Sequence, residues 1–194
     1  TVRRWDAAAL RAEFPTLHQR VMDRDLVYLD SAASAQQPQV VIDAVRAYMS
    51  TDHANVHRGV HALGRRATEA YEGARATTAA FIGASDPSEI VFTRGATEAI
   101  NLVAQTWALE NLEPEDAVIV TELAHHSNLV PWQMVAQRTG AEIRVVPIDE
   151  TGVLDQTVYE RLLDPLVKLV AVGHVSNAFG TVNPVPSMVE KAHA

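Results

Sequence analysis

A glycine turn between an apolar run and a helical pattern offers a place for an anion. Residues 90–93 read as a strand, Gly95, Ala96 and Thr97 form the turn, and apolar residues recur at helical spacing from Ile100 onward. Free backbone N–H groups at a helix start, together with a hydroxyl, are suited to hold a phosphate, and small residues let it approach. The same turn also serves as a simple helix cap in other proteins, so the motif needs support from the rest of the chain.

Two further polar clusters follow predicted strands. Residues 125–128 (His-His-Ser-Asn) come after the apolar run 117–121, and residues 174–177 (His-Val-Ser-Asn) come after 166–172. In a parallel sheet the carboxyl ends of the strands meet at one edge, where ligands bind. A histidine there can stack on a flat heteroaromatic ring or transfer protons, and an asparagine can bind a ring oxygen or a carboxylate. Three clusters at one edge favour a ligand site, although the serine or asparagine of the first could also be only a helix cap.

Helical and strand patterns alternate along the chain, which predicts an α/β fold with a mainly parallel sheet and helices on both faces. We expect residues 1–27 to form an N-terminal helix and arm, and residues 28–194 to form the body of the fold. The helical patterns cover 39–49, 61–81, 97–110, 128–138 and 155–163, and the strand patterns cover 90–93, 117–121, 143–147 and 166–172.

The composition limits the possible functions. The 194 residues are 47% hydrophobic, enough for one substantial core, and the net charge of −8 argues against general binding to nucleic acids or anionic membranes. No apolar run reaches membrane-spanning length, and no signal-peptide pattern opens the sequence. Cysteine is absent, so the chain has no disulfides and no thiolate metal ligands. We therefore expect a cytoplasmic protein.

Several motifs occur in an order that is similar to a known family. They are Tyr28–Ala35, Val56–His61, Thr93–Asn101, His125–Gln133 and His174–Asn177. Over nearly the whole chain they resemble the SufS-type, group II cysteine desulfurases of the class V aminotransferase superfamily. The resemblance implies the large domain of a fold-type I homodimer that uses pyridoxal 5′-phosphate (PLP). Such enzymes take sulfur from L-cysteine as an enzyme persulfide, leave alanine and supply iron–sulfur cluster assembly, which implies a sulfur-acceptor protein; related members act on selenocysteine.

The resemblance also implies roles for individual residues. Ala96 and Thr97 would bind the cofactor phosphate through backbone N–H and hydroxyl groups. His125 would stack on the pyridine ring and relay protons, as the catalytic residue within this chain. Asn177 would contact the ring oxygen and the substrate carboxylate.

Two more residues would lie on the substrate side of the site. The resemblance places Ala33 in a substrate-side arm and Arg58 in a loop near the active site of the dimer. One departure from the family is Ala124, where glutamate is usual, and it affects a local hydrogen bond rather than the stacking role of His125.

The chain lacks two groups that this chemistry needs. A PLP enzyme requires a lysine for the internal Schiff base, and the chain has only Lys168 and Lys191. Lys168 lies at the start of a predicted strand, at the wrong end for the site, and Lys191 lies in a helical tail. The family's lysine segment and its sulfur-accepting cysteine would follow residue 194. We therefore expect the N-terminal part of a desulfurase, with a fold that is incomplete at its C-terminus and no turnover of cysteine by itself.

Three other interpretations stay open. The chain could come from another class V PLP enzyme that shares the phosphate turn, such as an aminotransferase, a selenocysteine lyase or a kynureninase-like enzyme. It could be a non-catalytic module for dimerisation or partner binding. It could bind a metal through His53, His57 and His61, which recur every four residues, but Asn55 and Gly59 disfavour the helix that would align them. We expect no metal, no nucleic acid and no membrane partner.

Overall fold

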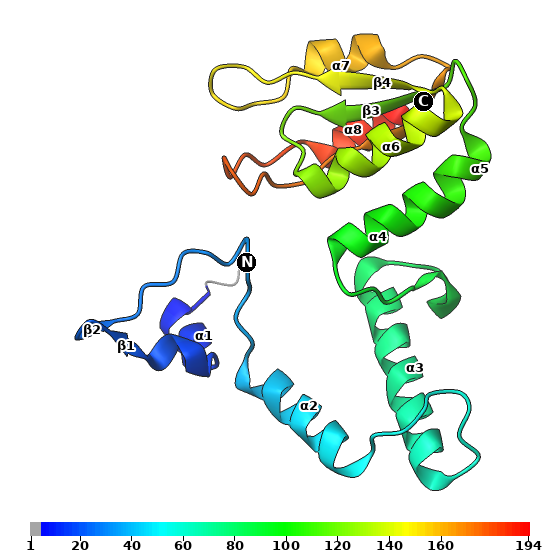
Figure 1. Ribbon diagram of the computed structural model, residues 1–194. Coiled ribbons are helices and arrows are strands. Elements are labelled where there is room, and N and C mark those ends of the chain that lie inside the picture. Colours follow the sequence, from blue (N-terminus) through cyan, green and yellow to red (C-terminus); the bar gives the residue numbers. More distant parts are fainter. Residues whose placement is uncertain (1–4) are drawn as a thin grey trace. The chain divides into compact units, whose positions relative to one another are not determined.

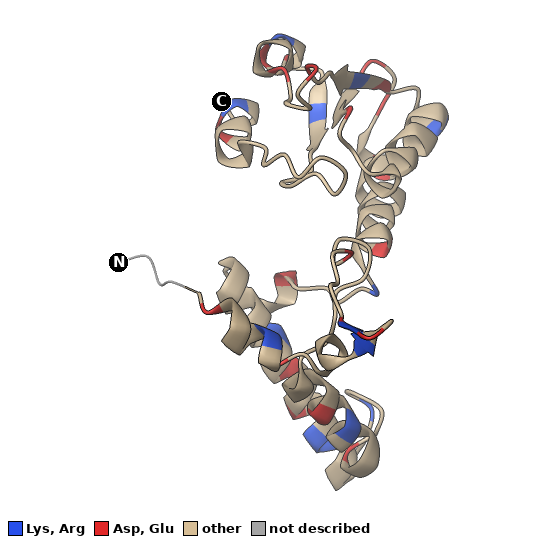
Figure 2. Cartoon of the chain, turned by 90° about the vertical axis from the view of Figure 1, so that its left-hand side faces the viewer, with Lys and Arg blue, Asp and Glu red and all other residues tan. Residues whose placement is uncertain are grey.

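The computed structural model describes residues 5–194, which form two compact units (Figure 1). The first unit runs to Val91, and the second is Phe92–Ala194. Acidic and basic residues are interspersed along the chain (Figure 2). Within residues 5–194, no helix combines the length and the apolar character that crossing a bilayer requires.

The first unit consists of helices and one short hairpin. Its elements are α1 (Ala7–Ala12), the 3-10 turn η1 (Pro15–His18), the antiparallel strands β1 (Arg20–Val21) and β2 (Arg24–Asp25), α2 (Gln39–Thr51), α3 (Ala62–Ile82) and the turn η2 (Pro87–Glu89). The helices predicted over 39–49 and 61–81 are confirmed, and a helix and hairpin occupy the predicted N-terminal arm, of which residues 1–4 lie outside the described residues. α3 ends at Gly83, whose φ of 76° is the left-handed conformation that commonly closes a helix.

The loop between α2 and α3 is seated on the first turns of α3. The backbones of Gly59 and Gly64 pack directly against each other, and a Cβ on Gly64 would lie 2.6 Å from the Gly59 Cα. The backbone N–H of His57 donates to Thr68 Oγ1 at 2.9 Å, and its imidazole Nε2 lies 2.6 Å from Glu72 Oε1. His57 has a φ of 67°, uncommon for a residue other than glycine, and these contacts hold it there.

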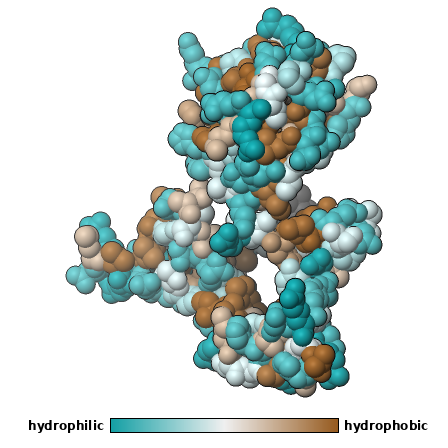
Figure 3. All heavy atoms as spheres, turned by 45° about the vertical axis from the view of Figure 1, so that its right-hand side comes forward, coloured by the Kyte–Doolittle hydropathy of each residue, from teal (hydrophilic) through white to brown (hydrophobic). Residues whose placement is uncertain are grey.

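Apolar side chains are exposed on α2. Val41, Val45 and Met49 recur every four residues on one helical face, and Val45 and Met49 are 55% and 63% exposed. Figure 3 shows that apolar residues reach the molecular surface in patches. An exposed apolar stripe of this kind is typical of a surface that another protein element covers.

The second unit is a three-stranded parallel sheet with helices on both faces (Figure 1). Its elements are α4 (Ala96–Val103), the π-helical turn η3 (Ala104–Ala108), α5 (Leu109–Asn111), β3 (Ala117–Thr121), the 3-10 turn η4 (His126–Asn128), α6 (Val130–Thr139), β4 (Glu142–Val146), α7 (Gln156–Leu162), β5 (Val167–Ala171) and α8 (Val185–Ala192). The strand order is β4-β3-β5, and β3 pairs in parallel with both neighbours. The predicted α/β class and parallel sheet are confirmed.

The core of this unit is built around β3, whose five residues are all buried. Side chains alternate across a strand, so Val118 and Val120 face one helical layer and Ile119 faces the other. On the first face they pack with Ala104, Ala108, Trp132 and Val135, from the η3 turn and α6. On the second face the partners are Tyr159 of α7 and Met188 of α8.

The strand predicted over residues 90–93 is wrong. This segment is not part of any β-ladder, and Val91 is 65% exposed while Ile90 is buried. The apolar pattern indicates a segment that tends to be extended and buried. A strand additionally requires a neighbouring strand for its hydrogen bonds, which an apolar pattern cannot reveal.

Gly64→Ala should destabilise the first unit, because its methyl group would meet the backbone of Gly59. We expect a loss of about 1–3 kcal/mol in the free energy of unfolding, measured by urea denaturation. Gly73→Ala is the matched control on the same helix, since a Cβ there meets no atom within 4 Å. It should stabilise by about 0.5–1 kcal/mol. Equal effects of the two substitutions would contradict the seating of the loop on α3.

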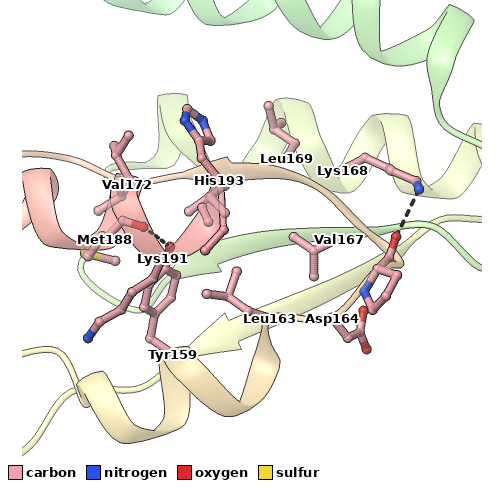
Figure 4. A pocket seen from close by; sticks show the side chains of 15 residues that line it. Tyr159, Leu163, Asp164, Val167, Lys168, Leu169, Val172, Met188, Lys191 and His193 are labelled. Carbon is pink, nitrogen blue, oxygen red and sulfur yellow. Dashed lines mark hydrogen bonds between the residues drawn. The ribbon is translucent and has the colours of Figure 1, made fainter.

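The open edge of β5 should make the 194-residue chain self-associate. Among the described strands, β5 pairs only with β3, and a groove of about 680 Å³ lies beside it, between β5, α7 and α8 (Figure 4). Light scattering over a concentration series should show a rising mean mass. A constant monomer mass would contradict the prediction that the β5 edge pairs with another copy of the chain.

Candidate functional site

The first turn of α4 is open to an anion. No side chain caps this helix, and Gly95 before it is nearly fully extended, with no atom within 4 Å of where a Cβ would lie. The N–H groups of Ala96 and Thr97 have no intrahelical acceptor, because the first four N–H groups of any helix lack one. The Thr97 hydroxyl makes no hydrogen bond within the described part of the chain. These groups are the donors that a phosphate requires.

A carboxylate in the same turn is neutralised locally. Glu98 accepts hydrogen bonds from the backbone N–H of Arg94 at 2.5 Å and from its guanidinium at 3.0 and 3.1 Å. The side-chain hydrogen bonds with Arg94 lower the pKa of Glu98, with a further contribution from the Arg94 backbone. The carboxylate therefore stays ionised and paired with Arg94, which limits its repulsion of an anion at the helix start.

Ser127 holds the imidazole of His125 in the loop after β3. The Nδ1 atom of His125 accepts the backbone N–H of Ser127 at 3.2 Å and lies 2.8 Å from the Ser127 hydroxyl. Nδ1 is thus an acceptor, so the neutral ring carries its proton on Nε2. The side chain is exposed. The ring is oriented by its own loop and keeps Nε2 and its faces available to a ligand.

Asn177 lies in the loop after β5. The parallel ladder pairs Val120 with Ala171, so β3 and β5 end side by side. The loops that carry His125 and Asn177 therefore leave the same edge of the sheet. The Asn177 side chain is exposed and makes no hydrogen bond within residues 5–194.

The structure brings the predicted cofactor-binding residues into one unit. α4, which begins with Ala96 and Thr97, contacts the η4 turn that follows His125. Asn177 follows the neighbouring strand at the same edge. The arrangement combines open N–H donors, an oriented imidazole and an amide, which can bind a phosphate, a flat ring and a carboxylate or phenolic oxygen.

The two predicted substrate-side residues belong to the first unit. Ala33 is exposed in a turn, where its N–H donates to Asp30 O at 3.2 Å. Arg58 is exposed in the loop that is seated on α3, next to His57. Their role in substrate binding stays a prediction.

Neither lysine lies at the carboxyl edge of the sheet. Lys168 is at the amino end of β5, where Nζ donates to Pro165 O at 3.0 Å (Figure 4). Nζ also lies 3.8 Å from Asp116 Oδ1. Lys191 is in the last turn of α8 and pairs with Glu160 of α7. Lys168 therefore lies at the start of its strand, as predicted.

The three histidines of the metal alternative do not share a helix. Residues 53–60 form no helix, and the ring of His53 packs edge-on against Tyr48. His57 binds Glu72, and His61 caps the start of α3. Within residues 5–194, no three side chains of metal-ligating type form a cluster.

Sequence reasoning missed Asn183. It is only 3% exposed and joins the two ends of the loop that carries Asn177, through bonds to Gly173 and His174. The sequence signal that indicates a turn at this position is the Asn-Pro pair at 183–184, which is typical of turns.

Comparison with known proteins places the chain. A model of the aminotransferase class-V family matches residues 27–194. Over 189 residues, 97% of this chain, it is 50% identical to a probable cysteine desulfurase of Mycolicibacterium paratuberculosis, of which it covers 28%. The chain therefore spans well under two thirds of this relative's length.

Two solved structures share its fold. One is the cysteine desulfurase CsdA (S-sulfonic acid) from Escherichia coli, with a TM-score of 0.81 and 39% identity. The other is the apo cysteine desulfurase from Thermococcus onnurineus NA1, with a TM-score of 0.85 and 34% identity. The alignments cover 98% and 100% of this chain and 46% of each structure. Because the family model matches most of its length, this chain belongs to the aminotransferase class-V family.

Proposed function

We propose that this chain supplies the phosphate cradle, the ring-stacking histidine and a substrate-side amide of a PLP-dependent cysteine desulfurase. The proposed reaction takes sulfur from L-cysteine as an enzyme persulfide and leaves alanine. The observation that carries the proposal is the uncapped start of α4 beside the His125 loop at the carboxyl edge of the sheet. The similarity to cysteine desulfurases over nearly the whole chain supports this reaction over the other class V activities.

The residues present fit PLP. The space at Gly95, which a Cβ would enter without contact, leaves the backbone N–H groups of Ala96 and Thr97 open to the phosphate. Arg94 compensates the charge of Glu98 next to that phosphate. When bound, PLP supplies an electron sink that makes the bonds at the substrate α-carbon labile.

His125 orients the ring and moves protons in this proposal. Its hydrogen bonds with Ser127 leave Nε2 to face the reacting groups. A flat imidazole over a pyridine ring excludes water from that face, and a histidine can exchange protons near neutral pH. Asn177 donates its amide to the ring oxygen or the substrate carboxylate, and the substrate-side roles of Arg58 and Ala33 are those that the family resemblance implies.

The chain lacks the covalent groups of the reaction. Cysteine is absent, and both lysines lie away from the carboxyl edge of the sheet. In the proposal, the Schiff-base lysine and the persulfide-forming cysteine belong to the remaining length that the relatives have. The 194-residue chain alone is then inactive.

The motifs and the composition support a finer proposal. We assign the parent enzyme to the SufS-type group II, acting in the cytoplasm with a sulfur-acceptor protein for iron–sulfur cluster assembly. The Val56–His61 and His125–Gln133 segments support this group, and the exposed apolar stripe of α2 supports a homodimer. Cysteine and selenocysteine as substrates are distinguished by comparing kcat/KM for both amino acids.

Thr97→Val in the full-length enzyme should weaken cofactor retention. Hydrogen bonds to charged groups are worth about 1.5–3 kcal/mol, so the apparent dissociation constant of PLP should rise roughly ten- to a hundredfold. The measurement is cofactor absorbance during dialysis. Thr106→Val is the matched control, because this hydroxyl lies in η3, donates to Leu102 O and should not alter retention. Equal retention in both variants would refute the phosphate assignment.

His125→Ala in the full-length enzyme should lower kcat about 10²- to 10⁴-fold, the usual contribution of a positioned acid or base. The bound PLP content should change much less, because the phosphate cradle is intact. His126→Ala, whose ring is tilted and 6.1 Å away, should lower kcat less. Steady-state kinetics and the PLP spectrum test this. The assignment is wrong if His125→Ala retains normal turnover.

A further inference from the structure

The loop that carries Asn177 is closed at its base by Asn183. The side-chain Nδ2 of Asn183 donates to Gly173 O at 2.7 Å, and its backbone N–H donates to His174 O at 2.8 Å. One buried residue therefore binds the two residues that enter the loop from β5. The chain then turns directly into α8 (Figure 1).

Above this base, the loop is an ordered hairpin. Val175 and Val182 form an antiparallel bridge, and the backbone N–H of Ser176 donates to Thr181 O at 2.9 Å. The Ser176 hydroxyl accepts backbone N–H groups at the tip, from Ala178 at 3.3 Å and Phe179 at 3.2 Å. Asn177 lies at this tip, so its position depends on how the base of the hairpin is held.

The tip is also docked on the turn before α7. Thr181 Oγ1 donates to Gly152 O at 2.9 Å. The ring of Phe179 lies against Gly152, where a Cβ would approach Phe179 Cδ1 to 2.8 Å. The hairpin is thus held at two places, its base and its tip. Among the described residues, the hydrogen bond from the Asn183 side chain is the only side-chain bond that joins the two ends of the hairpin.

Stability alone does not account for Asn183. Its Oδ1 atom is buried and has no hydrogen-bond partner within the described part of the chain. Burying an unpartnered acceptor is unfavourable, and an apolar residue of similar size would avoid that cost. What an apolar residue cannot supply is the Nδ2 donor to the Gly173 carbonyl.

We propose that Asn183 is a positioning residue of the desulfurase reaction, which sets the place of Asn177 at the active site by joining both ends of its hairpin. Asn183 acts through Asn177 and touches neither cofactor nor substrate. The inference rests on the proposed function, because it takes Asn177 as a ligand of the ring oxygen or the substrate carboxylate.

Asn183→Asp in the full-length enzyme tests the proposal. Aspartate keeps the shape of the side chain and the backbone bond to His174, and at a pH high enough to ionise this buried carboxyl group it cannot donate to Gly173 O. A displacement of about 1 Å at a binding group can cost up to a hundredfold in rate, so we expect kcat/KM for L-cysteine to fall roughly ten- to a hundredfold. PLP content should be unchanged, because α4 holds the phosphate separately.

A double-mutant cycle separates positioning from a general structural effect. In an Asn177→Ala background, Asn183→Asp should lower kcat/KM by no more than about twofold, because the group through which it acts is gone. Losses that multiply in the double variant would overturn the proposal, as would normal kcat/KM in the single variant. If Asn177→Ala itself has normal kinetics, the site assignment under the proposed function fails instead.

Two further variants distinguish a loss of positioning from a folding defect. Asn111→Asp removes the same kind of bond, Nδ2 to Trp107 O at 2.7 Å, at the end of α5, and should leave kcat/KM within about twofold of the wild type. Asn183→Leu is of similar size, avoids the unpartnered acceptor and lacks the Nδ2 donor to Gly173 O. If Asn183→Asp does not fold, Asn183→Leu decides: the proposal predicts a fall in kcat/KM that is absent in the Asn177→Ala background, and additive losses contradict it.

Discussion

The parallel pairing of β3 with both β4 and β5 is the constraint on which the candidate site depends. Parallel strands must end at the same edge, so the pairing delivers the loops after β3 and β5 to one place. The pairing also buries β3 completely, and the helical layers on its two faces fix how those loops begin. The polar groups at the edge are therefore positioned by an apolar core that contains none of them.

The sequence predicted the elements whose signals are local. Periodicity located α2, α3 and the strand 117–121, and the rule that parallel strands end together located the polar clusters 125–128 and 174–177. The family resemblance singled out His125 and Asn177 within these clusters. The sequence-based prediction failed at residues 90–93. A strand needs a neighbouring strand for its hydrogen bonds, and an apolar pattern does not show whether such a neighbour exists. The prediction also missed the Gly59–Gly64 contact and the Asn183 bonds, since both depend on how a loop backbone folds back on itself, which hydrophobic periodicity does not report.

The chain divides its polar chemistry between binding and anchoring. The side chains of Thr97 and Asn177 make no hydrogen bonds within the described structure. In contrast, three side chains make hydrogen bonds that hold the loops in place, namely those of Ser127, Asn183 and Thr181. This division is what a preorganised site requires, because a group that binds a ligand must be held by its neighbours rather than by its own contacts. The family match and the similarity to cysteine desulfurases are consistent with such a site.

The π-helical turn η3 has a consequence for how the phosphate cradle could change over evolution. It follows α4 directly, and its own end residues Ala104 and Ala108 belong to the buried core around β3. A π-turn holds one residue more than an α-turn, and each residue of an α-helix corresponds to about 100° of rotation. Losing one residue here would swing the start of α4 away from the His125 loop while the buried half stayed in place. Substitutions in this helix are thus far easier for the lineage to accept than changes in its length.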